Sequence, residues 1–380
     1  MAAIRAHMHG LDPYHLHDME ISGAPGGAYL RYTSTPIVDQ LFRLIARQNL
    51  YGFFWTGMLL AHFASMIAIP TVLSLTFWSR RPEAVLLSIG VFMSMFDAAG
   101  VTTLAAANNG TVLYGLIVVG AYLGLKRGRW TVLHASLVLA TAVKPFYAAF
   151  WILPVFAEGF SRRQLITSAV GAVLGVCPYV YFLLFQPHLF SEWSSSLLGQ
   201  TLHMNDVGDN VFGSLFAICR SVGALWAPYA AQAVYAAALF ATAAIGRWAG
   251  PRRWAVLFVL AVFVNPRIMP YDEAIASVPL LAVAMGLAPS RLSPETRLTI
   301  LAPTFVAVTL ALTYHRVGLG VLPYRLDPLV PASIVFPAIV LVVLGGSAMI
   351  ERRARRDPRW SVDDVGPGVS PFRPTAPEAS

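Results

Sequence analysis

The sequence predicts an all-α, polytopic integral membrane protein with about nine to eleven transmembrane helices. Hydrophobic residues make up 57% of the 380 residues and charged residues only 12%, whereas a soluble domain carries about 25% charged residues. One water-soluble core cannot bury so much apolar surface, so the bilayer must solvate much of it. Two further observations, long apolar runs and arginine clusters in alternate loops, agree with this class.

The apolar runs are spaced as membrane-spanning helices would be, each of which needs about 20 mostly apolar residues. A short pair of runs flanks Lys144-Pro145 and predicts a broken helix or a tight helical hairpin there. The predicted segments cover approximately residues 50–78, 84–104, 110–125, 130–143, 146–157, 164–185, 223–245, 253–264, 272–287, 296–314 and 326–350.

Basic residues gather in every second loop between these segments. Short cytoplasmic loops of membrane proteins are enriched in Lys and Arg, so the alternation predicts that the basic loops are cytoplasmic and the others extracytoplasmic. The same distribution explains the net charge of +8 and argues against a nucleic-acid partner. The basic loops are 79–81, 126–129, 161–163, 247–253, 291–297 and 351–356.

Three regions follow from this topology. Residues 1–49 are expected to form an extracytoplasmic loop with part of the active site, and residues 50–350 the transmembrane helical domain. Residues 351–380, rich in Arg, Pro and Ser, are expected to be a disordered cytoplasmic tail. Residues 186–210 are predicted to be a long outer loop. Because a polar segment does not cross a membrane unaided, we expect a further helix upstream of Met1; direct insertion of the N-terminal tail is the alternative.

Two cations on the predicted outer face are candidate ligands for the phosphate of a donor substrate. Lys144 is one of only two lysines and precedes the helix-breaking Pro145, so its ammonium can face a cavity. Arg267 lies on a rigid turn between Pro266 and Pro270. The alternatives are a lysine that extends to the membrane interface and an arginine that anchors a lipid headgroup.

Carboxylates and hydrogen-bonding side chains occupy the same predicted outer loops. Asp12 and Asp18 are candidates for a catalytic base or for hydroxyl binding, and simple solvation is the alternative. The histidines at positions 7, 9, 15 and 17 alternate, but no companion cysteine cluster accompanies them, so we expect no metal site and no cofactor. The candidate substrate-binding residues are Tyr14, Tyr32, Asn108, Asn109, Asp272 and His315.

Five short motifs, in this order, resemble those of the GT-C glycosyltransferases of family 87, which include polyprenyl-phosphate-mannose-dependent α-1,2-mannosyltransferases. The motifs are Gly10-Leu11-Asp12-Pro13-Tyr14, Tyr32-Thr33-Ser34-Thr35-Pro36, Asn108-Asn109-Gly110-Thr111, Ala142-Val143-Lys144-Pro145-Phe146 and Asn265-Pro266-Arg267 through Tyr271-Asp272. The third motif lacks the Gln that the family has there. The resemblance implies a GT-C-like fold, a polyprenyl-phosphate sugar donor, an outer-facing cavity and one carboxylate base.

The resemblance also bears on which carboxylate is the base. The family's catalytic Asp usually lies ahead of the Gly-x-x-Pro-Tyr stretch, which would place the base upstream of Met1 and leave Asp12 and Asp18 as substrate-site residues. The resemblance therefore implies a hexosyltransferase of the cell membrane that uses a lipid or glycan acceptor and works among membrane lipids. A lipid or anionic-solute transporter or flippase is the main alternative, and another membrane transferase is a third.

Overall fold

In the computed structural model, the described part of the chain is helical and contains no strand. The all-α, polytopic membrane class predicted from composition is thereby confirmed. The structure describes residues 2–15, 18, 34–78, 82–93, 109–156, 162–203, 226–246, 248, 250–265, 270–285, 287, 296–297, 299–303 and 329–356.

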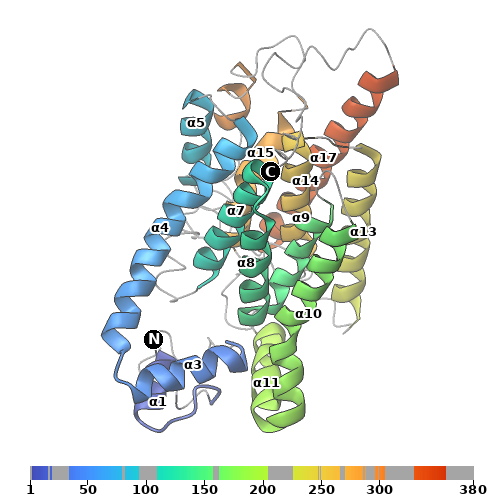
Figure 1. The fold of residues 1–380 in the computed structure, drawn as a ribbon. Helices are drawn as coiled ribbons and strands as arrows, with labels where there is room; N and C mark the ends of the chain where they lie inside the picture. Colours follow the sequence, from blue (N-terminus) through green and yellow to red (C-terminus); the bar gives the residue numbers. More distant parts are fainter. Residues whose placement is uncertain are drawn as a thin grey trace, which may run out of the picture.

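Long helices run back and forth between two ends of the molecule (Figure 1). The end that carries α1 and α11 is called the cap end, and the opposite end is called the basic end. The main helices are α4 (Tyr51–Trp78), α5 (Pro82–Met93), α7 (Gly110–Arg127), α8 (Trp130–Val143), α10 (Arg162–Phe185), α13 (Ala227–Gly246), α14 (Gly250–Phe263), α15 (Pro270–Ala284) and α17 (Leu329–Arg356).

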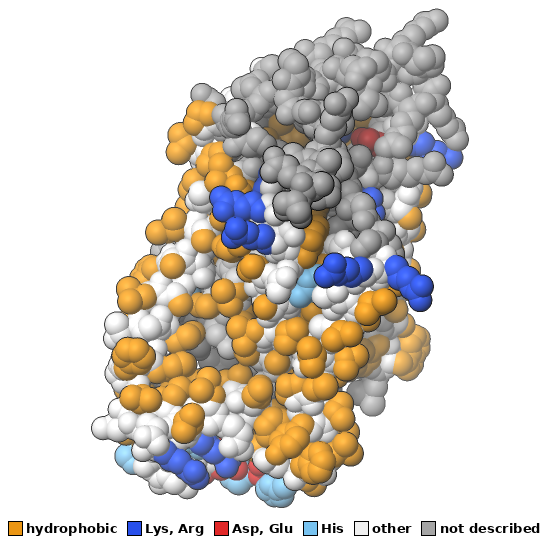
Figure 2. Space-filling view, viewed as in Figure 1, with side chains coloured by type: hydrophobic (Ala, Val, Ile, Leu, Met, Phe, Trp, Pro, Cys, Tyr) orange, Lys and Arg blue, Asp and Glu red, His pale blue; other side chains and the backbone are white. Residues whose placement is uncertain are grey.

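Three of the described helices are long and apolar enough to cross a membrane: Tyr51–Trp78, Arg162–Phe185 and Tyr229–Gly246. Large apolar side chains along α10, such as Val173 and Leu184, face outward, as lipid-facing residues do. In Figure 2 a broad band of hydrophobic side chains separates basic side chains above from a mixed group of acidic, His and basic side chains at the lower edge. The molecule is therefore a membrane protein with two chemically different polar ends.

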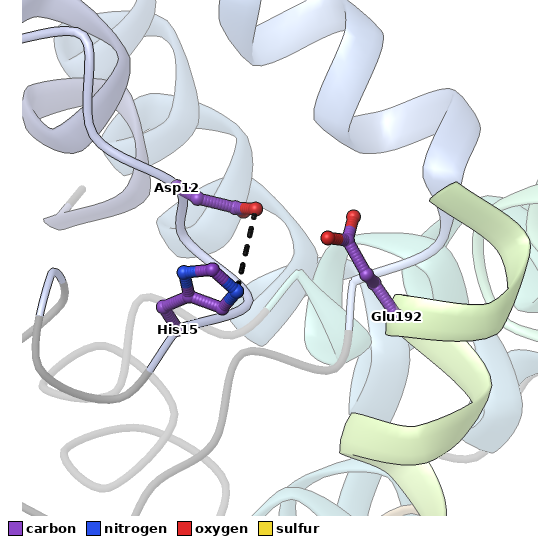
Figure 3. A group of neighbouring side chains, drawn as sticks. All are labelled: Asp12, His15 and Glu192. Atoms are coloured by element: carbon purple, nitrogen blue, oxygen red, sulfur yellow. Dashed lines mark ion pairs between the residues drawn. The ribbon is translucent and has the colours of Figure 1, made fainter. Parts of the chain in front are cut away.

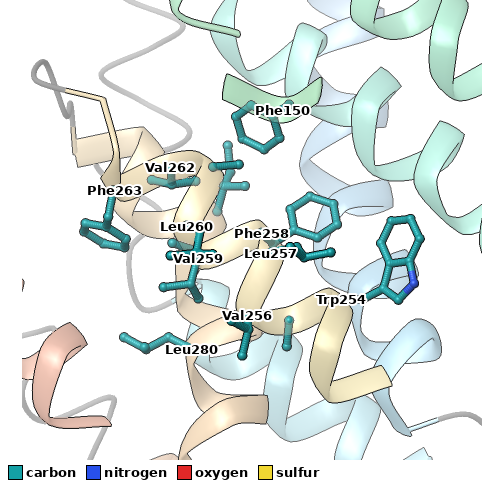
Figure 4. Packing of buried hydrophobic residues seen from close by; sticks show 14 of the residues in the cluster. Phe150, Trp254, Val256, Leu257, Phe258, Val259, Leu260, Val262, Phe263 and Leu280 are labelled. Atoms are coloured by element: carbon teal, nitrogen blue, oxygen red, sulfur yellow. The ribbon is translucent and has the colours of Figure 1, made fainter. Parts of the chain in front are cut away.

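Helix α14 forms the centre of the bundle. Every residue from Trp254 to Phe263 is buried, and a helix that is apolar all round belongs in an interior. Its side chains pack against Phe150 on one side and Leu280 of α15 on another (Figure 4). This core joins α4, α7, α8, α13, α15 and α17 into one body, which holds the cap end in place.

The predicted break at Lys144-Pro145 is present. Helix α8 ends at Val143, and Lys144 is extended at φ −145° and ψ 115°, as expected for a residue before proline. The next segment differs from the expected α-helix over 146–157, because Pro145–Trp151 forms the 3-10 helix η3 and only Ile152–Val155, α9, is α-helical. The break therefore leaves a short, irregular segment at the cap end.

Several segments predicted as loops or tail are helical. Residues 1–49 contain α1 (Ala2–Met8) and α3 (Pro36–Arg47), and the expected outer loop 186–210 contains α11 (Pro187–His203). Helix α17 continues to Arg356, so the predicted start of a disordered tail at residue 351 falls inside a helix. Helices α1, α3 and α11 are short or polar, and a search for long apolar runs does not detect them.

Candidate functional site

The candidate site is built on a helical cap that the N-terminal segment forms against the junction of α10 and α11. Ala3 and Tyr14 are buried against Phe182 of α10 and Trp193 of α11. Helix α3 lies beside α1 and contacts α8, α10 and α11. Apolar contacts therefore hold the residues of the first motif against the end of the helical bundle (Figure 1).

Asp39 organises the inner side of this cap. Its side chain is 0% exposed, yet it is paired on both oxygens: His7 Nε2 lies 2.7 Å from Oδ1 and Arg43 Nε donates to Oδ2 at 2.9 Å. A buried carboxylate is costly unless it is hydrogen-bonded and paired. The arrangement fixes α1 against α3 and holds the Arg43 side chain in a defined position.

The turn after α1 carries the first predicted motif. The Tyr14 backbone N–H donates to Asp12 Oδ1 and the Asp12 N–H donates to Asp18 Oδ2, each at 2.9 Å. The Tyr14 hydroxyl donates to the Ser34 carbonyl oxygen at 2.9 Å. Burial raises the pKa of Tyr14 above its usual value, and the nearby Asp39 and Asp12 charges raise it further. Tyr14 is therefore a neutral donor that fastens the turn.

An open pocket of about 370 Å³ lies between this turn and the start of α11. The pocket is lined by Asp12, Arg43, Gln186, Pro187, His188, Leu189 and Glu192. It thus brings a guanidinium and two carboxylates to one solvent-facing space. Asp18, the other predicted carboxylate, braces the Asp12 backbone and does not line this pocket.

Lys144 lies at the cap end, beside residues that connect to the same cap. The Thr35 hydroxyl donates to the carbonyl oxygens of Ala142 and Val143, and the Tyr179 hydroxyl donates to those of Thr141 and Ala142. Tyr179 in turn packs against Trp193 of the cap. The ammonium of Lys144 lies 5.9 Å from the centre of the Phe146 ring. Lys144 is not among the lining residues of the described pocket.

Asn109 and Asp272 are joined to the break through two tyrosines. The Tyr114 hydroxyl donates to Asp272 Oδ1 at 2.7 Å, and the Tyr147 hydroxyl donates to the carbonyl oxygen of Gly110, next to Asn109. The two rings contact each other edge to face. Asp272 is therefore a buried residue that ties the first turn of α15 to α7 and η3, and its carboxylate does not line the pocket.

The remaining predicted residues, Arg267, Tyr32, Asn108 and His315, lie outside the described residues. The structure adds Asp39, Arg43 and Glu192 to the site. The spacing of Asp39 and Arg43 is that of an i, i+4 ion pair on a helix face. The sequence predicts this ion pair if residues 36–47 are assumed to form a helix.

Comparisons with known proteins give no relative. No family model matches the chain, and neither the curated proteins nor the solved structures contain a match.

Proposed function

We propose that the chain is a membrane glycosyltransferase that moves a hexose from a polyprenyl-phosphate donor to a lipid or glycan acceptor. The observation that carries the proposal is the pocket at the cap end, where Asp12 and Arg43 face one space beside the apolar bundle. A donor with a prenyl chain and a charged sugar phosphate needs both an apolar surface and a polar pocket at its edge. The order of motifs that resembles family 87 supports the same reaction.

The reaction requires a base and a counter-charge. In the proposed step, a carboxylate oxygen of Asp12 accepts the proton of the acceptor hydroxyl while that hydroxyl oxygen attacks the anomeric carbon. The bond from the anomeric carbon to the phosphate oxygen breaks, and polyprenyl phosphate leaves. Lys144 and Arg267 are the proposed cations that stabilise the charge on the leaving phosphate, with Arg43 as an additional one.

The geometry favours Asp12 over Asp18 as the base. Asp12 lines the pocket and its side chain is 28% exposed, whereas Asp18 accepts a hydrogen bond from the Asp12 backbone. We therefore propose that Asp18 stabilises the turn and does not take part in proton transfer. Tyr14 holds the same turn through its hydrogen bond to Ser34. Asn109 remains a proposed substrate contact, whereas Asp272, buried and bonded to Tyr114, is proposed to support the neighbouring segments and not to touch substrate.

The proposed location is the cell membrane with the pocket on the extracytoplasmic face. Among the described residues, the helix ends and turns at the basic end carry Lys126, Arg127, Arg129, Arg162, Arg163, Arg252, Arg253, Arg352 and Arg353. This bias is the one expected of a cytoplasmic face. A transporter would place polar groups for its solute near the middle of the membrane, whereas the described pocket lies at one end of the bundle.

The test is transfer of radiolabelled hexose from a polyprenyl-phosphate donor in membranes that contain the chain, together with release of polyprenyl phosphate. A form extended to the next upstream start codon is assayed beside the 380-residue chain. We expect Lys144→Met and Arg267→Ala each to weaken donor use by about 1–3 kcal/mol, which is the loss of a charge-assisted phosphate contact. Asp12→Asn should slow transfer by about a hundredfold or more.

Two variants serve as matched controls. Lys126→Met removes the only other lysine, at the basic end, and Glu351→Gln removes a carboxylate of that same end. Both should leave transfer unchanged. Absence of transfer from both forms of the chain contradicts the proposed function, and full activity of Asp12→Asn contradicts the assignment of the base.

A further inference from the structure

Three side chains at the mouth of the pocket converge in a way that the proposed reaction does not require. Asp12, His15 and Glu192 each offer one ligand atom, and these atoms all lie within 4.8 Å of one another. Asp12 and His15 come from the turn after α1, whereas Glu192 projects from α11 (Figure 3). Two segments far apart in the sequence thus present a nitrogen and two carboxylate oxygens to one point.

The residues behind these three are placed as the outer shell of a metal site would be. Asp12 Oδ1 accepts from the Tyr14 N–H, which orients its carboxylate, and Oδ2 is the oxygen nearest His15 Nε2, at 4.0 Å. On its other side, His15 Nδ1 lies 4.0 Å from Asp18 Oδ2. Metal-bound histidines commonly present the second ring nitrogen to a carboxylate; the Asp18 carboxylate is near this nitrogen, although 4.0 Å is longer than a hydrogen bond. His188 Nδ1, at 3.3 Å from Glu192 Oε1, orients the third member.

The charges around the cluster also favour the binding of a cation. Asp12 and Glu192 bring two carboxylates together across the pocket, and like charges at this separation repel each other. Arg43, the arginine that lines the pocket, donates its Nε–H to the buried Asp39 carboxylate, so part of its charge is already paired. A dication between the two carboxylates would convert this repulsion into attraction and join the N-terminal turn to α11.

We propose that Asp12, His15 and Glu192 bind one divalent transition-metal ion of the Zn²⁺ or Mn²⁺ type. One imidazole and two carboxylates suit these ions better than Ca²⁺ or Mg²⁺, which prefer oxygen ligands alone. Ligand atoms around tetrahedral zinc are about 3.4 Å apart, given metal–ligand distances near 2.1 Å. The ligand atoms are up to 4.8 Å apart, so binding requires the side chains to rotate inward, which the 65% exposed His15 side chain can do. The pocket leaves room for water or a substrate oxygen in the remaining position.

The inference concerns ion binding and stands whether or not the chain transfers sugar. If Asp12 is also the base of the proposed reaction, the bound ion occupies the carboxylate that would accept the proton. The ion-loaded protein is then the slower form in transfer. Binding is therefore measured directly and not through activity.

The experiment is isothermal titration of the purified full-length chain in detergent, after treatment with EDTA, with Zn²⁺ and separately with Mn²⁺. We expect one ion per chain and a higher thermal midpoint when the ion is present, because a ligand that binds only the folded state stabilises it. Asp12→Asn, His15→Ala and Glu192→Gln should each weaken binding by at least about tenfold, the loss seen even for outer-shell partners.

His9→Ala and Glu351→Gln are the matched controls, since His9 is an exposed histidine at the end of α1 and Glu351 lies at the basic end. Both should bind as the wild-type chain does. An unaltered thermal midpoint in EDTA shows that a ligand variant is folded before its affinity is compared. The proposal is wrong if the wild-type chain binds neither ion. It is also wrong if all three ligand variants bind the ion as tightly as the wild-type chain does.

Discussion

At the scale of single residues, Asp39 forms the buried pairs of the cap and was not predicted. Its carboxylate is fully buried and holds both His7 and Arg43. Asp12, Tyr14 and Lys144 were predicted as site residues from the alternation of basic loops, and their roles in a site stay predictions. Asp39 stands in an ordinary amphipathic pattern, and only the docking of α1 on α3 makes it a buried partner.

Replacing Asp39 with Asn keeps the shape of the side chain and removes its charge. We expect the free energy of unfolding to fall by about 2–3 kcal/mol, the contribution of hydrogen bonds to a charged group. The measurement is the thermal midpoint of the purified protein in detergent. Glu351→Gln is the comparison, because the Arg252–Glu351 pair at 3.3 Å is partly solvent-exposed and such pairs contribute about 0–1 kcal/mol. Equal midpoints for the two variants would show that Asp39 does not hold the cap.

At the scale of helices, the strongly apolar elements are predictable and the polar ones are not. The predicted segment 130–143 coincides with α8, and 164–185 lies within α10, because a bilayer demands long apolar runs. Helices α3 and α11 cover the end of the bundle instead, and neither contains such a run. Tyr147 and Phe150 of η3 are buried in the core, and these contacts with distant helices are not encoded in any local pattern.

The packing of α7 on α8 depends on a close approach at Gly120. A Cβ added there would lie 2.9 Å from Leu133 Cα and 3.2 Å from the Leu133 backbone nitrogen. Small residues allow such close contact between helices in membranes. Gly120→Ala should therefore separate the two helices and lower the free energy of unfolding by about 1–3 kcal/mol, as overpacking does.

Gly57→Ala in α4 is the matched control, because an added Cβ there meets no described atom within 4 Å. Alanine is also the better helix former, by up to about 1 kcal/mol. This variant should be neutral or slightly more stable than the wild-type chain, again by thermal midpoint. If both glycines tolerate alanine equally, the α7–α8 contact is looser than the structure indicates.

At the scale of the whole molecule, the two polar ends differ in kind. The basic end combines Lys126 and Arg127 of α7 with the arginines that end α17, whereas the cap end combines buried ion pairs with an open pocket. The alternation of charge along the sequence predicted two such ends. It did not predict that the N-terminal segment and α11 would fold together over one of them, because that depends on contacts between residues far apart in the chain.

The orientation of these ends decides which compartment the pocket faces, and cysteine labelling tests it. In a chain with Cys177 and Cys219 replaced by Ser, single cysteines are introduced by Arg47→Cys at the end of α3 and by Arg352→Cys at the end of α17, both exposed positions. Basic loops stay in the cytoplasm because translocation disfavours Lys and Arg. A membrane-impermeant maleimide should therefore label position 47 in intact cells and position 352 only after permeabilisation. The reverse pattern would place the pocket in the cytoplasm, where the proposed acceptor of the outer face could not reach it.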